Sequence, residues 1–201
     1  MSKYRIFTES KEFVFTNNVV LCGVFGVIVF LYLLQEYIFS WFLISERNYQ
    51  FLMLLPVCLA LYYKLFLSWQ KYEPLEGTLN TYLELNENVI IIENAKYSLT
   101  EIKSIEILNF DFKGDRNYSG GGNYNGILSN GIGNLFKINL VEGKSIEVNF
   151  QQDNQNEIAS AKKELVSYYT NGKISRENFL KIFGYNESDK DIVEAIVKYH
   201  S

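Results

Sequence analysis

Residues 19–69 read VVLCGVFGVIVFLYLLQEYIFSWFLISERNYQFLMLLPVCLALYYKLFLSW, and they divide the chain into two kinds of sequence. Two long apolar runs are joined by the polar break Ser45–Asn48. A helical span of a bilayer needs about 20 apolar residues, and Val19–Leu34 carries no charge. The sequence therefore predicts a two-helix transmembrane hairpin over residues 18–70, preceded by a cytoplasmic N-terminal segment over residues 1–17.

Two charged side chains, Glu36 and Lys64, lie inside the apolar runs. In the expected register both sit near helix ends, where a charged group can reach water. The alternative is that they act as intramembrane polar groups, and it stays open. Lys and Arg residues concentrate on the side of the two termini, with Arg47 alone in the connecting loop. This bias predicts a multi-pass protein of the cell inner membrane, with both termini and the following domain in the cytoplasm.

The charge balance and the small number of cysteine and histidine residues exclude several classes of function. Residues 1–70 carry five basic and four acidic residues, which leaves 14 basic and 19 acidic residues for residues 71–201. An acidic domain argues against nucleic acid and against strong binding to anionic lipid head groups. Cys22 and Cys58 lie in the apolar runs, and His200 is the one histidine. No cofactor, metal site or histidine-based catalysis is therefore expected.

Beyond a short hinge at residues 73–77 the pattern changes to period two. Alternating or continuous apolar residues predict strands from Thr78, over 89–92, over 102–112 with a bulge, over 135–140 and over 146–150. Apolar positions at helical spacing then predict a helix over residues 154–170, with Lys162, Lys163 and Glu164 on its polar side. An antiparallel sheet with one apolar face covered by a helix follows.

This run, with the segments YSLTEIKSI (97–105) and GKSIEVNF (143–150), resembles the bacterial pleckstrin-homology-like (PH-like) domains, which are often attached to paired transmembrane helices. The resemblance implies an α+β fold: a transmembrane hairpin, a PH-like antiparallel β domain over residues 75–170 with a C-terminal helix, and short terminal helices. Many PH domains bind phosphoinositides through basic loops, but the strand loops here lack a Lys/Arg cluster.

Residues 171–201 form the predicted C-terminal helical pair. Ser175 is placed to cap a helix over residues 176–183, and Gly184 to end it. The segment resembles a short helical pair associated with oligomerisation; the second half of an EF-hand is disfavoured, because the loop lacks the carboxylates that Ca²⁺ needs. Ile192 and Ile196 belong to an apolar stripe on the last helix. That stripe either packs on the sheet domain or binds a partner.

Residues 113–134 contain seven glycines but no phosphate-binding signature. Such a loop is a surface segment by default, and Tyr118, Gly121 and Tyr124 are its candidate partner-binding residues. Asp111 and Asp115, with Arg116 adjacent, are the candidate acid–base pair, and an exposed pair in a loop usually reflects turn chemistry. An enzyme is therefore not expected.

The predicted function is a membrane-anchored cytoplasmic binding or scaffold module, which recruits or senses a protein partner at the inner membrane face. The expected partners are another protein or a second copy of the chain, together with the lipid bilayer. The alternatives are a subunit of an oligomeric membrane assembly, a transporter or channel, or a membrane immunity protein.

Overall fold

The computed structural model describes residues 1–12, 15–34, 46–63, 66, 70–116, 126–186 and 190–200. The chain forms two compact units: unit 1 holds residues 1–11, 75–115 and 129–201, and unit 2 holds residues 12–74 and 116–128.

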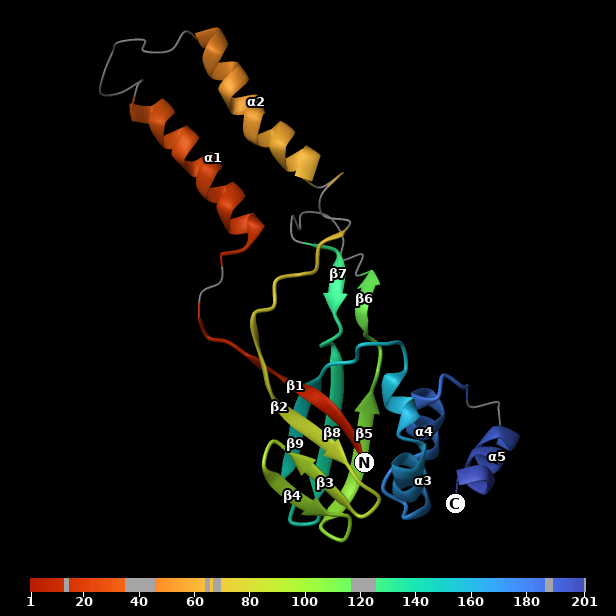
Figure 1. Ribbon diagram of the computed structural model, residues 1–201. Helices are drawn as coiled ribbons and strands as arrows, with labels where there is room; N and C mark the ends of the chain where they lie inside the picture. Colours follow the sequence, from red (N-terminus) through yellow and green to blue (C-terminus); the bar gives the residue numbers. More distant parts are fainter. Residues whose placement is uncertain are drawn as a thin grey trace. The chain divides into compact units, whose positions relative to one another are not determined.

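Figure 1 labels the elements along the chain. Their order is β1 (Ser2–Glu9), α1 (Asn17–Leu34), α2 (Glu46–Tyr62), β2 (Gly77–Leu85), β3 (Val89–Ile92), β4 (Ala95–Ser98), β5 (Ile102–Leu108), β6 (Lys113–Arg116), β7 (Leu128–Asn130), β8 (Asn134–Leu140), β9 (Ser145–Phe150), the 3₁₀ helix η4 (Glu157–Ser160), α3 (Lys162–Thr170), α4 (Arg176–Ile182) and α5 (Lys190–His200).

Unit 1 is built on a seven-stranded sheet in the order β4-β3-β2-β1-β9-β8-β5. Every pairing recorded between these strands is antiparallel. β1 joins the two halves of the sheet: it pairs with β2 along its length, from Ser2 opposite Leu85 to Glu9 opposite Gly77. Its recorded pairing with β9 covers only Ile6 and Phe7. The N-terminal strand therefore holds together two groups of strands that come from distant parts of the chain.

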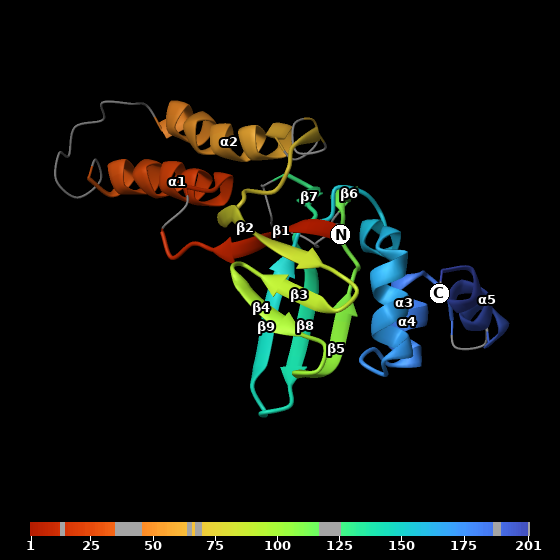
Figure 2. The same cartoon turned by 60° about the horizontal axis from the view of Figure 1, so that its bottom comes forward.

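The core of unit 1 lies where the sheet meets α3 and α4. Alternate residues of β5 and β8 point inward and are buried, as the period-two pattern requires. α3 adds Leu165 and Tyr168, and α4 adds Phe179. In both views the two helices lie next to each other beside β5 (Figures 1 and 2). Each fully buried apolar side chain of this kind stabilises the fold by roughly 1.5–3 kcal/mol.

The segment after α3 covers the outer edge of β5, the last strand of the sheet. Ile105 N donates to the Lys173 carbonyl over 2.7 Å. The Asn178 side chain pairs with the backbone of Ile107 in both directions, accepting from its N–H over 2.9 Å and donating to its carbonyl over 2.7 Å. An open sheet edge invites pairing with other chains, so α4 protects this edge with a side-chain amide in place of a strand.

Replacing Asn178 with Ala is expected to lower the free energy of unfolding by about 1–3 kcal/mol, because the backbone groups of Ile107 lose their partners. Urea unfolding measures the loss, and amide hydrogen exchange at Ile107 should become faster. Glu177→Ala is the matched control, because Glu177 is exposed on the same helix and forms an ion pair with Lys181 in the adjacent turn. This variant should change stability by less than about 0.5 kcal/mol. Equal losses for the two variants would contradict a role in protecting the edge.

The C-terminal ends of α3 and α4 and the start of α4 follow local rules. Ser175 caps α4, and its side chain accepts from Asn178 N, as the sequence predicts. Gly184 has φ +76° and ends the helix, with the hydrogen bonds Gly184 N to Lys181 O and Tyr185 N to Leu180 O. Gly172 ends α3 in the same way with φ +67°. These are Schellman motifs, in which glycine supplies the left-handed conformation.

Unit 2 contains the antiparallel pair α1 and α2. Asn17 Nδ2 donates to the Tyr63 hydroxyl over 2.7 Å, which ties the start of α1 to the residue after α2. A groove of about 360 Å³ lies between the helices, and the free cysteines Cys22 and Cys58 are exposed. The lining of this groove is apolar and consists of Leu21, Cys22, Phe25, Gly26, Pro56, Val57, Ala60 and Leu61.

The prediction of a transmembrane hairpin over residues 18–70 is contradicted. α1 has 18 residues and α2 has 17, and α2 begins with the polar residues Glu46–Asn48. Within the described part of the chain, neither helix combines the length and the apolar character that crossing a bilayer demands. The predicted inner-membrane location fails on the same finding, and Glu36 and Lys64 lie outside the described residues.

The predicted fold class is also corrected at the N-terminus. Residues 2–9 form a strand of the sheet, whereas the sequence indicated a separate cytoplasmic segment. What remains is an α+β fold with an antiparallel sheet. The resemblance to PH-like proteins with two N-terminal transmembrane helices is therefore contradicted. The predicted bulge of the third strand is confirmed, because the register of β5 against β8 shifts between Ile102 and Ser104.

Candidate functional site

A hollow of about 460 Å³ opens on unit 1 beside the first turn of α3. We call it the Glu164 hollow. The β2–β3 turn forms one wall, and α3 fixes that turn: the Tyr168 hydroxyl donates to Asn86 O over 2.7 Å, and Ser167 Oγ donates to Glu87 O over 2.8 Å. The lining residues are Met1, Asn86, Glu87, Asn88, Val89, Ile91, Lys96 and Glu164.

Glu164 is the most unusual side chain of this hollow. Its residue is only 6% exposed, and its Oε1 lies 2.8 Å from the amino nitrogen of Met1. Burial opposes ionisation, but the hydrogen bond and charge of that amino group, with hydrogen bonds from the Glu164 backbone and Ser2, hold the pKa of the carboxyl below its ordinary value. A buried carboxylate is stable only when a cation and hydrogen-bond donors satisfy it. The hollow therefore holds a negative charge paired with a primary amine.

Two tyrosines adjoin this carboxylate. Burial, together with the charges of Glu157 and Glu164, raises the pKa of Tyr4 to about 12, although hydrogen bonds to Ser160 and Ser2 oppose the shift. Burial and the charge of Glu164 likewise raise the pKa of Tyr168. Both phenols stay protonated at neutral pH, so they act as hydrogen-bonding groups and not as nucleophiles. The cluster suits the binding of a cation better than acid–base chemistry.

Replacing Glu164 with Gln is expected to lower the free energy of unfolding by about 1–2 kcal/mol at pH 7. The folded-state pKa lies below the ordinary value of 4.5, so the stabilisation is present above that pH and is lost as the pH falls through the folded-state pKa. Urea unfolding at pH 7 and at pH 3 checks this, and the difference in stability between the two proteins should be smaller at the lower pH. A difference that persists unchanged at pH 3 would show that the carboxylate charge is not the cause.

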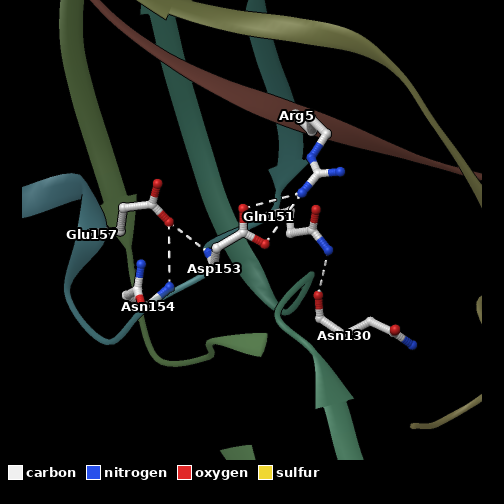
Figure 3. A network of polar contacts seen from close by, with 6 residues as sticks. All are labelled: Arg5, Asn130, Gln151, Asp153, Asn154 and Glu157. Atoms are coloured by element: carbon white, nitrogen blue, oxygen red, sulfur yellow. Dashed lines mark hydrogen bonds and ion pairs between the residues drawn. The ribbon is translucent and has the colours of Figure 1, made fainter. Parts of the chain in front are cut away.

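A second polar cluster lies where β1 meets the segment after β9 (Figure 3). Arg5 Nη2 approaches both carboxylate oxygens of Asp153, at 3.2 and 3.1 Å. Figure 3 places the Gln151 side chain between Arg5 and Asn130, and its Nε2 donates to Asn130 O over 2.7 Å. Glu157 Oε2 accepts from Asp153 N over 2.6 Å. The ion pair is about half exposed, so it stabilises little; the cluster anchors β1 to the rest of the unit.

Asp111, one member of the predicted acid–base pair, has a structural role. Asp111 Oδ2 accepts from Ser129 Oγ over 2.7 Å and from Gly133 N over 2.8 Å. Asn134 and Gln152, both fully buried, extend this network, with Gln152 Nε2 donating to Asn134 Oδ1 over 3.0 Å. Asp111 thus closes the base of the glycine-rich segment. Satisfied buried networks of this kind fix a fold, and this carboxylate is committed to it.

Only two of the five predicted partner-binding residues lie within the part of the chain that the structure describes. Tyr118, Gly121 and Tyr124 lie outside the described residues. Ile192 falls within α5, and Ile196 is half-buried and packs against the core of unit 1. Ile196 thus follows the packing alternative, in which the last helix contacts the body of the unit.

Sequence reasoning missed Glu164. Its neighbours Lys162 and Lys163 are exposed, and the helical pattern placed all three on the polar side. No local signal marks Glu164 as buried, because its burial depends on β1, which the sequence did not reveal. Acidic residues in a first helical turn are ordinary, so the position by itself was uninformative.

Metal chemistry finds no support in the described ranges: within them, no three His, Cys, Asp or Glu side chains come close enough together to hold an ion. Comparison of the chain with family models, curated proteins and solved structures finds no match. The function must therefore be inferred from the residues of the site themselves.

Proposed function

We propose that this protein is a binding module that recognises a protein partner, with the Glu164 hollow as the principal contact. The observation that carries the proposal is a buried, ionised carboxylate facing an open hollow of about 460 Å³. Asn86 and Asn88 supply amide groups at its rim, and Val89 and Ile91 add a small apolar surface. A mixed lining of this kind is typical of a protein–protein contact, whereas small-molecule pockets are predominantly apolar.

An enzyme is a weaker proposal. The tyrosine hydroxyls beside this cluster belong to Tyr4 and Tyr168, whose raised pKa values keep them protonated. A nucleophile needs an adjacent base within hydrogen-bond reach. Glu164 is already engaged by a cation at 2.8 Å, and Asp111 is engaged by Ser129 and Gly133. Because both carboxylates already have partners, a binding function is favoured over an enzymatic one.

Site-specific photo-crosslinking tests the proposal in the cells that make the full chain. A photoreactive p-benzoylphenylalanine at Asn88, on the rim of the hollow, is expected to capture a discrete protein. The same residue at Lys103, which is exposed on β5, serves as the control position. Capture at Asn88 should fall strongly with Glu164→Gln. Identical products from Asn88 and Lys103, or capture that is unaffected by Glu164→Gln, would refute the hollow as the contact.

A further inference from the structure

We infer that the Glu164 hollow binds a primary alkylammonium group, and that the group a partner presents there is a lysine side chain. This inference rests on the proposed function and names the chemistry of the contact. It starts from what the carboxylate already binds. Glu164 Oε1 lies 2.8 Å from the Met1 amino nitrogen, so the site accepts a primary ammonium in hydrogen-bonding geometry.

The burial of Glu164 makes this preference strong. The Glu164 side chain is 8% exposed, and a buried carboxylate is stable only when a cation or hydrogen-bond donors lie beside it. A primary ammonium offers three donors around a compact charge, which suits a single carboxylate whose other donors come from its own backbone and Ser2.

The present occupant belongs to an exposed residue. Met1 is 76% exposed, and the β1 pairing begins only at Ser2. Its amino group can therefore leave the hollow without disturbing the buried side chains of the strand, of which Tyr4 is the first. A lysine side chain is long and flexible, so it can reach the carboxylate from the rim while its stem contacts Val89 and Ile91.

The charges at the rim affect how strongly a cation binds. Glu87 and Lys96 both line the hollow and are exposed, with opposite signs. A cationic ligand is repelled by Lys96, so Lys96→Ala should tighten binding about two- to threefold at low salt. Lys103→Ala removes the same charge outside the hollow and should leave binding unchanged.

The test uses the full chain labelled with ¹⁵N and titrated with N-acetyl-lysine N-methylamide as the probe. A second form of the protein carries Gly-Ser ahead of Met1, which turns the competing amino group into an amide. In the extended form the probe should shift the amide signals of Asn88, Val89 and Lys96, with affinity at least about fivefold higher than in the original chain. Glu164→Gln should weaken binding about tenfold or more.

Three further probes identify the chemistry. N-acetyl-norleucine N-methylamide lacks the amine, and the ε-acetylated lysine probe masks it; neither should shift the signals. Methylamine carries the charge without the stem, and it should bind more weakly than the lysine probe if the partner group is a lysine. Asn88→Trp, which narrows the hollow and keeps Glu164, should reduce binding of the lysine probe in a protein whose other signals are unchanged.

Equal binding of the lysine and norleucine probes would overturn the inference, as would no lysine-dependent shift in the extended chain. Binding of methylamine as tight as that of the lysine probe would retain the ammonium site and refute the lysine assignment. Photo-crosslinking separates these failures from failure of the proposed function. A partner captured at Asn88 that excess lysine probe does not displace would leave the binding module standing and remove only the ammonium chemistry.

Discussion

Replacing Phe179 with Ala is expected to lower the free energy of unfolding by about 3–5 kcal/mol, the usual range for removing a fully buried phenylalanine. Phe179 lies in α4 with no solvent exposure. Its ring stacks on Tyr169 with centroids 4.6 Å apart and contacts Phe183 at 5.0 Å. Truncation leaves a cavity between α3 and α4, and it removes the anchor that holds α4 against β5.

The second consequence of Phe179→Ala is local. Ile105 and Ile107 depend on the segment over residues 173–178 for their outward hydrogen bonds. Loosening α4 should therefore speed amide exchange at these two residues more than at Ile138, in the interior strand β8. Urea unfolding and hydrogen exchange measure the two effects. Phe110→Ala is the control, since Phe110 is 73% exposed and its loss should change stability by less than about 0.5 kcal/mol. A loss below about 1 kcal/mol for Phe179→Ala would contradict the packing of α4.

Replacing Gly131 with Ala is expected to lower the free energy of unfolding of unit 1 by about 4 kcal/mol or more. Gly131 has φ +71°, a region that costs other residues about 1–2 kcal/mol. A Cβ would also clash with the Gln152 carbonyl oxygen and lie 2.5 Å from Lys113 N. Both are backbone atoms, and they bond to each other over 2.8 Å, so neither can move aside cheaply.

Gly172→Ala is the matched control for this prediction. Gly172 has φ +67°, but a Cβ there meets nothing within 4 Å. The backbone strain is therefore similar, and the clash is absent; about 1 kcal/mol is expected. Thermal unfolding of both variants, followed by circular dichroism, isolates the steric contribution as their difference. Equal destabilisation would show that the close approach of the backbone at Gly131 is relieved without penalty.

The sequence allowed much of unit 1 to be predicted. The strand from Thr78, the β-branched run that forms β3, and the hairpin of β8 and β9 follow from alternation within a few residues. Ser175 and Gly184 bound α4 through contacts that span three or four residues. The prediction of a transmembrane hairpin over residues 18–70 was wrong, because it inferred membrane-spanning helices from apolar composition. In the described chain, α1 and α2 are shorter than the apolar runs that suggested them.

The candidate site could not be predicted in this way. Tyr4 and Ile6 are the only buried apolar residues of β1, too few for a clear period-two pattern. The strand forms because it pairs with β2, some 75 positions further along the chain. Asp111 looked like a loop carboxylate, and its partners Ser129 and Gly133 come from the far end of the glycine-rich segment.

The sequence alone determined the alternating strands, the caps of α4 and the acidic balance of the second half of the chain, because each depends on neighbours within one helical turn or on composition. Only the tertiary structure decided that the N-terminal strand joins the two halves of the sheet, that Asn178 protects an edge strand, and that Glu164 is buried beside an amine. These outcomes arise from contacts between residues tens to more than a hundred positions apart, and no local pattern encodes such contacts.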